Sequence, residues 1–272
     1  MMAGISLVRA TLRSRRSVML WFGLVGAAYA WMVVALYETI ASGFDMQSYI
    51  DAMPEEMLVM AGMSADSLDE GKFGFAQWMA VEFFTWFGWA VAVWGLIAGA
   101  GLIAGEVENG TIDMVLSQPV RRERFLLARF AGVAAVLLTI SLACFLGILL
   151  GMAISDVDAS VAGLFFACLQ MALLGLAVAG IGVLLSVGTL SSRRSQMVLV
   201  GLVVAEYAMD VVSEIKSDLG WLGKLSVFHY FDPAQIVSSG TPDGLGLVVL
   251  VGVAAIGLGV AAWLFGRRDM AR

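Results

Sequence analysis

Charged residues are scarce in this chain, and their scarcity excludes most classes of soluble protein. Of its 272 residues, 14% are charged and 60% are hydrophobic, whereas a soluble domain carries about 25% charged and about 45–50% apolar residues. The net charge of −6 has the wrong sign for a nucleic-acid-binding protein, which would be basic. The composition therefore indicates a polytopic membrane protein and excludes an ordinary cytosolic enzyme, a disordered chain and a nucleic-acid partner.

Residues that usually carry chemistry are also scarce. His229 is the only histidine, which excludes a His-Glu-x-x-His metalloprotease site and most histidine-based triads. Cys144 and Cys168 both lie inside apolar runs and predict neither a disulfide framework nor a zinc site. The sequence has neither a Gly-x4-Gly-Lys-Ser/Thr phosphate loop nor a Gly-x-Ser-x-Gly elbow. We therefore expect no catalytic residues and no cofactor bound by this chain.

Methionines recur at helical spacing between the first and second apolar runs. Thioethers suit Cu(I), but methionine is also a general apolar filler, and the chain contains 16 methionines. We therefore favour an amphipathic packing face and predict no metal site for the four residues concerned, which are Met53, Met57, Met60 and Met63.

Long apolar runs are what the sequence has in abundance. A helix needs about 20 apolar residues to cross a bilayer. We predict an all-α fold in one domain, residues 1–272, with six transmembrane helices over residues 18–40, 78–105, 125–153, 160–190, 195–212 and 244–266. Before the first run, residues 5–16 place apolar and arginine side chains on different helical faces, which predicts an amphipathic helix in the membrane interface.

Basic residues alternate between the two ends of these runs. All but three of the 16 basic residues lie in segments 1–17, 106–129, 193–194 and 267–272, the exceptions being Lys72, Lys216 and Lys224. Because cytoplasmic loops carry an excess of Lys and Arg, both termini are predicted to be cytoplasmic. The acidic residues show the opposite bias. We expect the membrane to be the plasma membrane.

The loop between the second and third runs, residues 106–124, has an internal organisation. Asn109-Gly110 predicts a helix break, Thr111 is a candidate N-cap, and Pro119 ends the helix that would follow. The result would be a short cytoplasmic helix between two kinks that exposes Ile112, Val115 and Leu116. Physical reasoning alone leaves two interpretations open, a docking surface for a partner protein or a plain loop lying on the headgroups.

The same loop resembles the cytoplasmic loop of ABC-2 type ABC-transporter permeases, through the run Glu-x-x-x-Gly-Thr-x-x-x-x-Leu-Ser-x-Pro-x-x-Arg. The residues that match this run are Glu106, Gly110, Thr111, Leu116, Ser117, Pro119 and Arg122. The N-terminal arginine-rich segment, the segment 53–58 with Gly62, and the ending Phe265-Gly266-Arg267-Arg268-Asp269 are also similar to this family. The resemblance extends over nearly the whole chain.

The resemblance implies a membrane permease subunit, an exporter rather than an enzyme, that works with a separate ATPase subunit. ATP and Mg²⁺ would be bound by that partner. A second permease chain, identical or homologous, would complete the complex in the lipid bilayer. The loop would form the coupling helix that contacts the ATPase, with transmission carried by Glu106, Gly110, Thr111, Ile112, Leu116, Pro119 and Arg122.

The resemblance also implies an outer helical hairpin between the fifth and sixth spans, and residues 213–242 fit that place. Asp232-Pro233 is a turn signal between two apolar pieces that are too short to span a membrane. The aromatic cluster of His229, Tyr230 and Phe231 precedes Pro233. Interfacial aromatic residues usually anchor helices, and a gating role rests on family analogy alone.

Two acidic residues inside the fifth predicted span, Glu206 and Asp210, are four positions apart and so share one helical face. They would either line a polar pathway or lie near the outer interface because the span ends early. The first option opens an alternative function, an ion-coupled secondary carrier, although no inverted repeat supports it. A non-transporting membrane scaffold is the third option.

Overall fold

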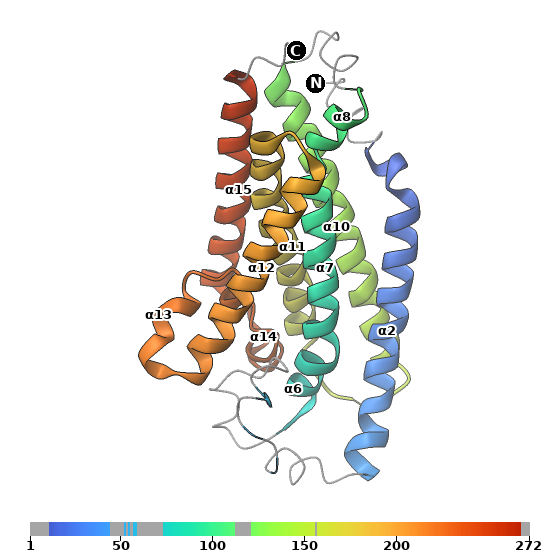
Figure 1. Cartoon of the computed structure of the whole chain (residues 1–272). Helices are drawn as coiled ribbons and strands as arrows, with labels where there is room; N and C mark the ends of the chain where they lie inside the picture. Colours follow the sequence, from blue (N-terminus) through green and yellow to red (C-terminus); the bar gives the residue numbers. More distant parts are fainter. Residues whose placement is uncertain are drawn as a thin grey trace.

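A computed structural model describes residues 11–43, 52, 54, 57–58, 73–111, 121–155 and 157–267. Every regular element in these ranges is a helix, and no strand occurs in them. Five helical stretches are long and apolar enough to cross a membrane, and they form the bundle in Figure 1. They are α2 (Arg16–Gly43), α6–η1–α7 (Phe75–Ala100), α10 (Arg122–Met152), α11 (Val161–Thr189) and α15 (Gly244–Arg267).

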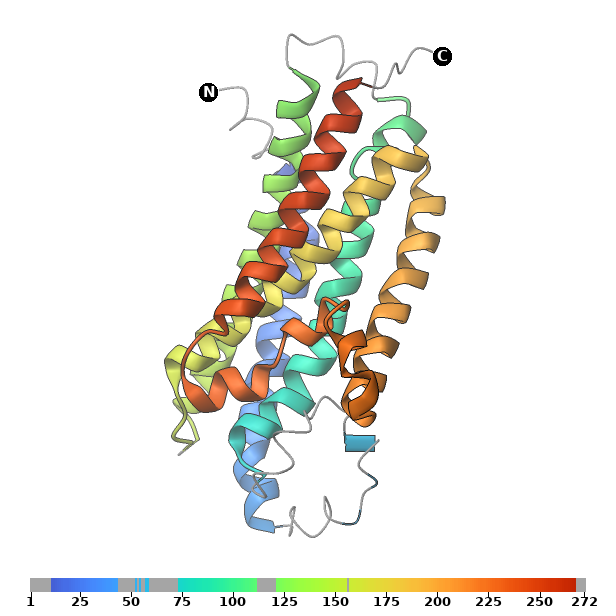
Figure 2. The same ribbon diagram turned by 90° about the vertical axis from the view of Figure 1, so that its left-hand side faces the viewer.

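The fifth predicted span corresponds to α12 (Ser192–Ile215), which is similar in length but less apolar. Charged side chains at Arg193, Arg194, Glu206 and Asp210 interrupt its apolar sequence, and it is not among the five candidate spans. It nevertheless packs against α11 and α7 and runs alongside them (Figures 1 and 2). The all-helical architecture is therefore established, whereas the sixth span stays a prediction.

Helix α11 is the centre of the bundle, since it packs against α7, α10, α12, α14 and α15. In its most apolar window 67% of the residues are buried, against 28% in the corresponding windows of α2 and α15. The outer faces of α2 and α15 expose large apolar side chains such as Trp21, Leu24, Val248 and Ile256. Most residues of these two helical windows are therefore not buried inside the chain.

Glycines allow α11 to approach its neighbours closely. A Cβ atom at Gly95 of α7 would collide with the carbonyl oxygen of Gly175 on α11, and one at Gly99 would lie 2.8 Å from the Cα of Ala179. In membranes, where lipid is as apolar as leucine, such backbone contact is a main source of helix association. This Gly-x3-Gly pair therefore packs inside the chain.

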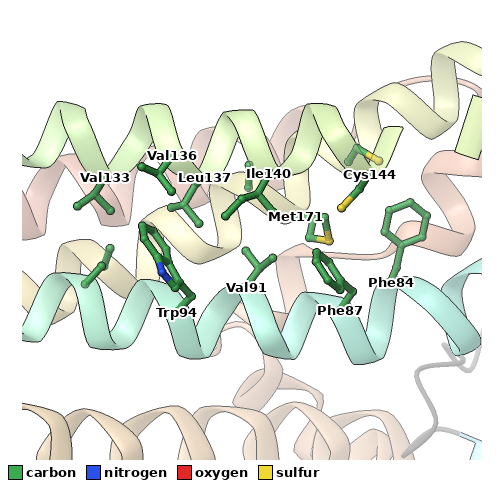
Figure 3. Close-up of a cluster of buried hydrophobic side chains, with 14 of the residues drawn as sticks. Phe84, Phe87, Val91, Trp94, Val133, Val136, Leu137, Ile140, Cys144 and Met171 are labelled. Carbon is green, nitrogen blue, oxygen red and sulfur yellow. The ribbon is translucent and has the colours of Figure 1, made fainter. Parts of the chain in front are cut away.

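Large apolar side chains fill the space between α7 and α10. Figure 3 shows Phe87, Val91 and Trp94 facing Val133 and Leu137 across this gap. Met171 of α11 and Phe84, both fully buried, close the cluster. The core is thus a continuous apolar layer that fixes α7, α10 and α11 relative to one another.

The second predicted span, 78–105, is broken in the structure, and this corrects the sequence prediction. The helix begins earlier, at Phe75, and ends at Ala100, and a turn at 101–103 leads into the separate helix α8 (Ala104–Glu108). The hydroxyl of Ser186 on α11 accepts hydrogen bonds from the backbone N–H groups of Ile103 (3.1 Å) and Ala104 (2.9 Å). A buried side chain that is distant in the sequence therefore satisfies the backbone N–H groups that the helix break leaves unpaired.

The same stretch contains a π-helical segment that the sequence did not predict. It comprises η1 (Ala80–Thr85), between α6 (Phe75–Met79) and α7 (Trp86–Ala100). The Thr85 hydroxyl donates to the carbonyl oxygen of Ala80 at 2.8 Å. Such π-bulges often occur at functional sites, and this one lies at the end of the bundle opposite α8 (Figure 1).

Candidate functional site

Helix α8 begins the predicted coupling segment, and its Glu106 carboxylate points at α10. Glu106 forms an ion pair with Arg129 of α10 and accepts a hydrogen bond from the Thr111 hydroxyl. The Thr111 backbone N–H also donates to the Glu106 carbonyl oxygen at 3.0 Å. Charge-assisted bonds of this kind are stronger than neutral ones. Glu106 therefore fixes α8 against α10.

Glu108, which the sequence analysis did not single out, connects α8 to α12. Its Oε1 accepts the Ser192 backbone N–H at 2.8 Å and the Ser191 hydroxyl at 3.2 Å. Hydrogen bonds from Ser192 first, and from Ser191, lower the pKa of this carboxyl below its usual value. A carboxylate at a helix N-terminus also interacts favourably with the helix dipole. Glu108 thus caps α12 from another segment.

Gly110 ends α8 in a left-handed conformation with φ of +67°. The Asn109-Gly110 pair therefore breaks a helix, as its sequence indicates, but the helix that ends there is α8 and not the second span. Of the other predicted coupling residues, Arg122 begins α10. Ile112, Leu116 and Pro119 lie outside the described residues, and so does the predicted coupling helix.

At the other end of α12, Glu206 and Asp210 both turn toward the segment that follows the helix. Glu206 is 7% exposed and lies against the backbone N–H of Val227, while its Oε2 has no hydrogen-bond partner among the described residues. The Oδ1 atom of Asp210 lies 3.4 Å from Nδ1 of His229. The predicted shared face is therefore present, and it faces the interior of the molecule.

The segment after α12 turns back along the bundle before it reaches α15 (Figure 2). It consists of η2 (Ser217–Leu219), α13 (Gly220–Gly223), η3 (Phe228–Tyr230) and α14 (Pro233–Ser239). The Asp232 side chain caps α14 by accepting the Gln235 N–H at 3.0 Å, and Pro233 is the first helical residue. The turn signal in the sequence is thus the start of a short helix.

Gln170, in the middle of α11, holds this returning segment in place. It is fully buried, and its Nε2 donates to the Tyr230 carbonyl oxygen at 2.7 Å. Gln170 was not predicted from the sequence. The available signal was a lone amide inside a long uncharged run, where a polar side chain is costly without a partner.

A cavity of about 120 Å³ lies where α12, the returning segment and the η1–α7 helix meet. Of the residues predicted in the outer hairpin and the polar pathway, Asp210, His229, Phe231 and Pro233 line it. Glu206 and Tyr230 are not among its lining residues. Asp232, which the sequence marks as part of a turn signal, also lines the cavity. The rest of the wall comes from residues that were not predicted, which are Phe84, Thr85, Gly88, Trp89, Leu174, Tyr207, Val211, Glu214 and Phe228.

A comparison with known protein families identifies the family of this chain. A family model described as "ABC-2 family transporter protein" matches residues 8–270, nearly the full length. No curated protein matches the sequence closely enough to count as a relative. The chain, with its apolar helical bundle, therefore belongs to the ABC-2 family of transporter proteins and is a multi-pass membrane component of transport.

Proposed function

We propose that this chain is the membrane subunit of an ATP-driven exporter and that a separate ABC ATPase docks on residues 106–124. Family membership supports a permease that works with an ABC ATPase. The sequence contains no phosphate loop, so ATP and Mg²⁺ would be bound by the partner. The observation that carries the proposal is that α8, whose second half begins this loop, is bonded to two different long helices.

These two connections give the ATPase a mechanical route into the membrane. A displacement of the loop would act on α10 through Glu106 and Arg129, and on α12 through Glu108 and Ser192. Helix α12 has 24 residues and is therefore roughly 36 Å long at 1.5 Å per residue. Its far end carries Asp210 into the cavity. Movement at α8 would thus change the shape of the cavity.

The proposed arrangement has six spans, with α12 as the fifth, and both termini in the cytoplasm. The basic residues Arg193, Arg194 and Arg267 support it, because they lie at the helix ends nearest α8 (Figure 1). The exposed apolar faces of α2 and α15 suit lipid and a second permease chain in the plasma membrane. The chain would act as one domain.

The test is affinity purification of the full chain from its native membrane in mild detergent. We expect an ABC ATPase to co-purify in stoichiometric amount. Gly110→Val places a β-branched residue at a positive φ and should reduce the recovered ATPase at least tenfold. Gly201→Val is the matched control, because nothing lies within 4 Å of a Cβ at Gly201 on α12. A clean preparation without any ATPase would refute the proposal.

A second function, an ion-coupled carrier, is favoured by one observation. Glu206 is buried inside α12 with a carboxylate oxygen that has no hydrogen-bond partner among the described residues, and an ionisable group of this kind in a membrane helix is by default a functional candidate. Transport that survives ATP depletion but is abolished by Glu206→Gln would select this function over the exporter.

A further inference from the structure

Three aromatic rings form one side of the cavity. Trp89 and Phe228 are stacked with their ring centroids 4.9 Å apart. Tyr207 meets both rings edge-on, at 4.6 Å from Trp89 and 5.7 Å from Phe228. Faces of aromatic rings carry partial negative charge and attract cations, tryptophan most strongly. A cation over a face that the other rings leave open is therefore favoured over a neutral or anionic group.

The charged side chains of the cavity have the same sign. Asp210, Glu214 and Asp232 line it, and His229 is the only basic side chain among them. No lysine or arginine of the described ranges lies in its wall. At short range, carboxylates around a partly dry space attract a positive ligand strongly, since there is little water to screen them.

One carboxylate oxygen of Asp210 lacks a hydrogen bond among the described residues. Its Oδ1 atom is buried and has no hydrogen-bond partner in the described part of the chain, and the nearest basic atom, Nδ1 of His229, is 3.4 Å away. Burying a carboxylate oxygen without compensation is costly. A cation in the cavity would supply that compensation.

The arrangement does not suit a metal ion. No group of three or more His, Cys, Asp or Glu side chains converges on one point within the described residues, whereas Ca²⁺ and Mg²⁺ require several oxygen atoms within about 2.0–2.6 Å. Spread carboxylates and aromatic faces instead match a cation whose charge is diffuse and whose surface is apolar. The cavity volume, about 120 Å³, is slightly below that of an engineered cavity of about 150 Å³ that binds benzene.

We propose that this cavity binds an organic cation through an ammonium head group of about the size of trimethylammonium. Trp89, Tyr207 and Phe228 contact the methyl groups, and Asp210 balances the charge. Binding stands on the cavity alone. The further statement that such cations are the transported substrates rests on the proposed function.

The experiment uses the full chain in lipid nanodiscs and two small probes. Choline carries a trimethylammonium group, and 3,3-dimethylbutan-1-ol is its neutral isostere. Saturation-transfer NMR on the methyl protons measures the affinity of each probe. We expect choline to bind at least tenfold more tightly than the alcohol, because only choline has the charge. Equal affinities, or no binding of either probe, would overturn the proposal.

Two substitutions locate the site. Asp210→Asn and Trp89→Leu should each weaken choline binding at least tenfold. Their matched controls are Asp158→Asn, an exposed acid before α11, and Trp86→Leu, a residue that is 64% exposed and does not line the cavity. Both controls should leave choline affinity unchanged. Choline binding that is unaffected by Asp210→Asn would place the cation elsewhere and refute the assignment.

A second pair of milder variants tests the site if Asp210→Asn or Trp89→Leu fails to fold. Glu214→Gln removes a cavity charge and Trp89→Phe keeps an aromatic face, so we expect a three- to tenfold loss for each. The two proposals fail separately. Choline binding without any co-purified ATPase would leave the cavity assignment standing and refute the exporter, whereas an ATPase complex that does not discriminate between the probes would do the reverse.

Discussion

The two ends of the bundle treat their carboxylates in opposite ways. Near α8, Glu106 and Glu108 each accept bonds from a specific partner, Arg129 for the first and Ser192 for the second. Near α14, Glu206 and Asp210 each keep a buried oxygen without a hydrogen bond among the described residues. Carboxylates with a partner on another helix hold the two helices together, whereas carboxylates with an unsatisfied oxygen can bind a ligand. The α8 end is thus suited to transmission and the α14 end to binding.

Removing Arg129 should have the largest effect on stability, because it leaves an unpaired carboxylate at the α8 end as well as at the α14 end. Arg129→Met leaves the Glu106 carboxylate without its cation and also removes the contact of the guanidinium with the Phe125 ring. We expect a loss of about 2–3 kcal/mol in unfolding free energy, below the value for a fully buried pair because both side chains are about one-fifth exposed. Titration with dodecyl sulfate in mixed micelles measures it.

The double variant Arg129→Met with Glu106→Gln is the control for that prediction. It removes the orphaned charge, so it should be more stable than Arg129→Met alone. If the double variant lost the sum of the two single effects, the ion pair would not be what fixes α8 against α10.

Gln170→Leu tests what holds the α14 end in shape. The substitution leaves the Tyr230 carbonyl oxygen without its donor, and we expect a loss of about 1–2 kcal/mol. Choline affinity should fall with it, since Phe228 and His229 precede Tyr230 in the cavity wall. If Gln170→Leu changed neither the unfolding free energy nor the choline affinity, packing alone would position the segment between α12 and α15.

Glu206→Gln should have a smaller effect, and one of the opposite sign. It replaces a buried carboxylate oxygen that has no hydrogen bond by a neutral amide, so the unfolding free energy should rise by about 0.5–1 kcal/mol. The same measurement on Glu106→Gln should show a decrease. If both substitutions lowered the unfolding free energy, the carboxylates at the α8 end and the α14 end would not differ in the way described.

The smallest effect concerns pH. Because the pKa of Glu108 is lowered in the folded protein, its contacts with α12 are fully present above the usual carboxyl range, about 4.3, and are lost as the pH falls through the lowered value. Stability of wild type and Glu108→Gln should therefore differ at pH 7 and converge in acid. A constant difference down to pH 3 would contradict the assignment.

Much of the helical framework follows directly from the sequence. Apolar runs predict the long helices, the four-residue spacing of Glu206 and Asp210 predicts their common face, and Asp232-Pro233 predicts a turn. These features depend on neighbours in the chain, which is why they can be derived without the structure.

Features that depend on distant partners could not be predicted. The break after Ala100 occurs inside a run of small apolar residues, and it is stabilised by Ser186 from another helix. In the sequence, Trp89 is one more apolar residue of a predicted span. Its contacts with Tyr207 and Phe228 form only in the folded chain. The coupling helix itself stays a prediction, because residues 112–120 lie outside the described ranges.

The π-helical segment η1 has a consequence for how relatives of this protein diverge. A π-turn contains one residue more than an α-turn, so deleting a single codon within 80–85 would convert η1 to α-helix. Because a π-turn accommodates its extra residue locally, the helices on the two sides of the deletion would keep nearly the same orientation, whereas the side chains of residues 80–85 would be redistributed around the helix. A one-residue gap at this place in an alignment would therefore mark a changed cavity wall at Phe84 and Thr85, with Trp89 of α7 still in position.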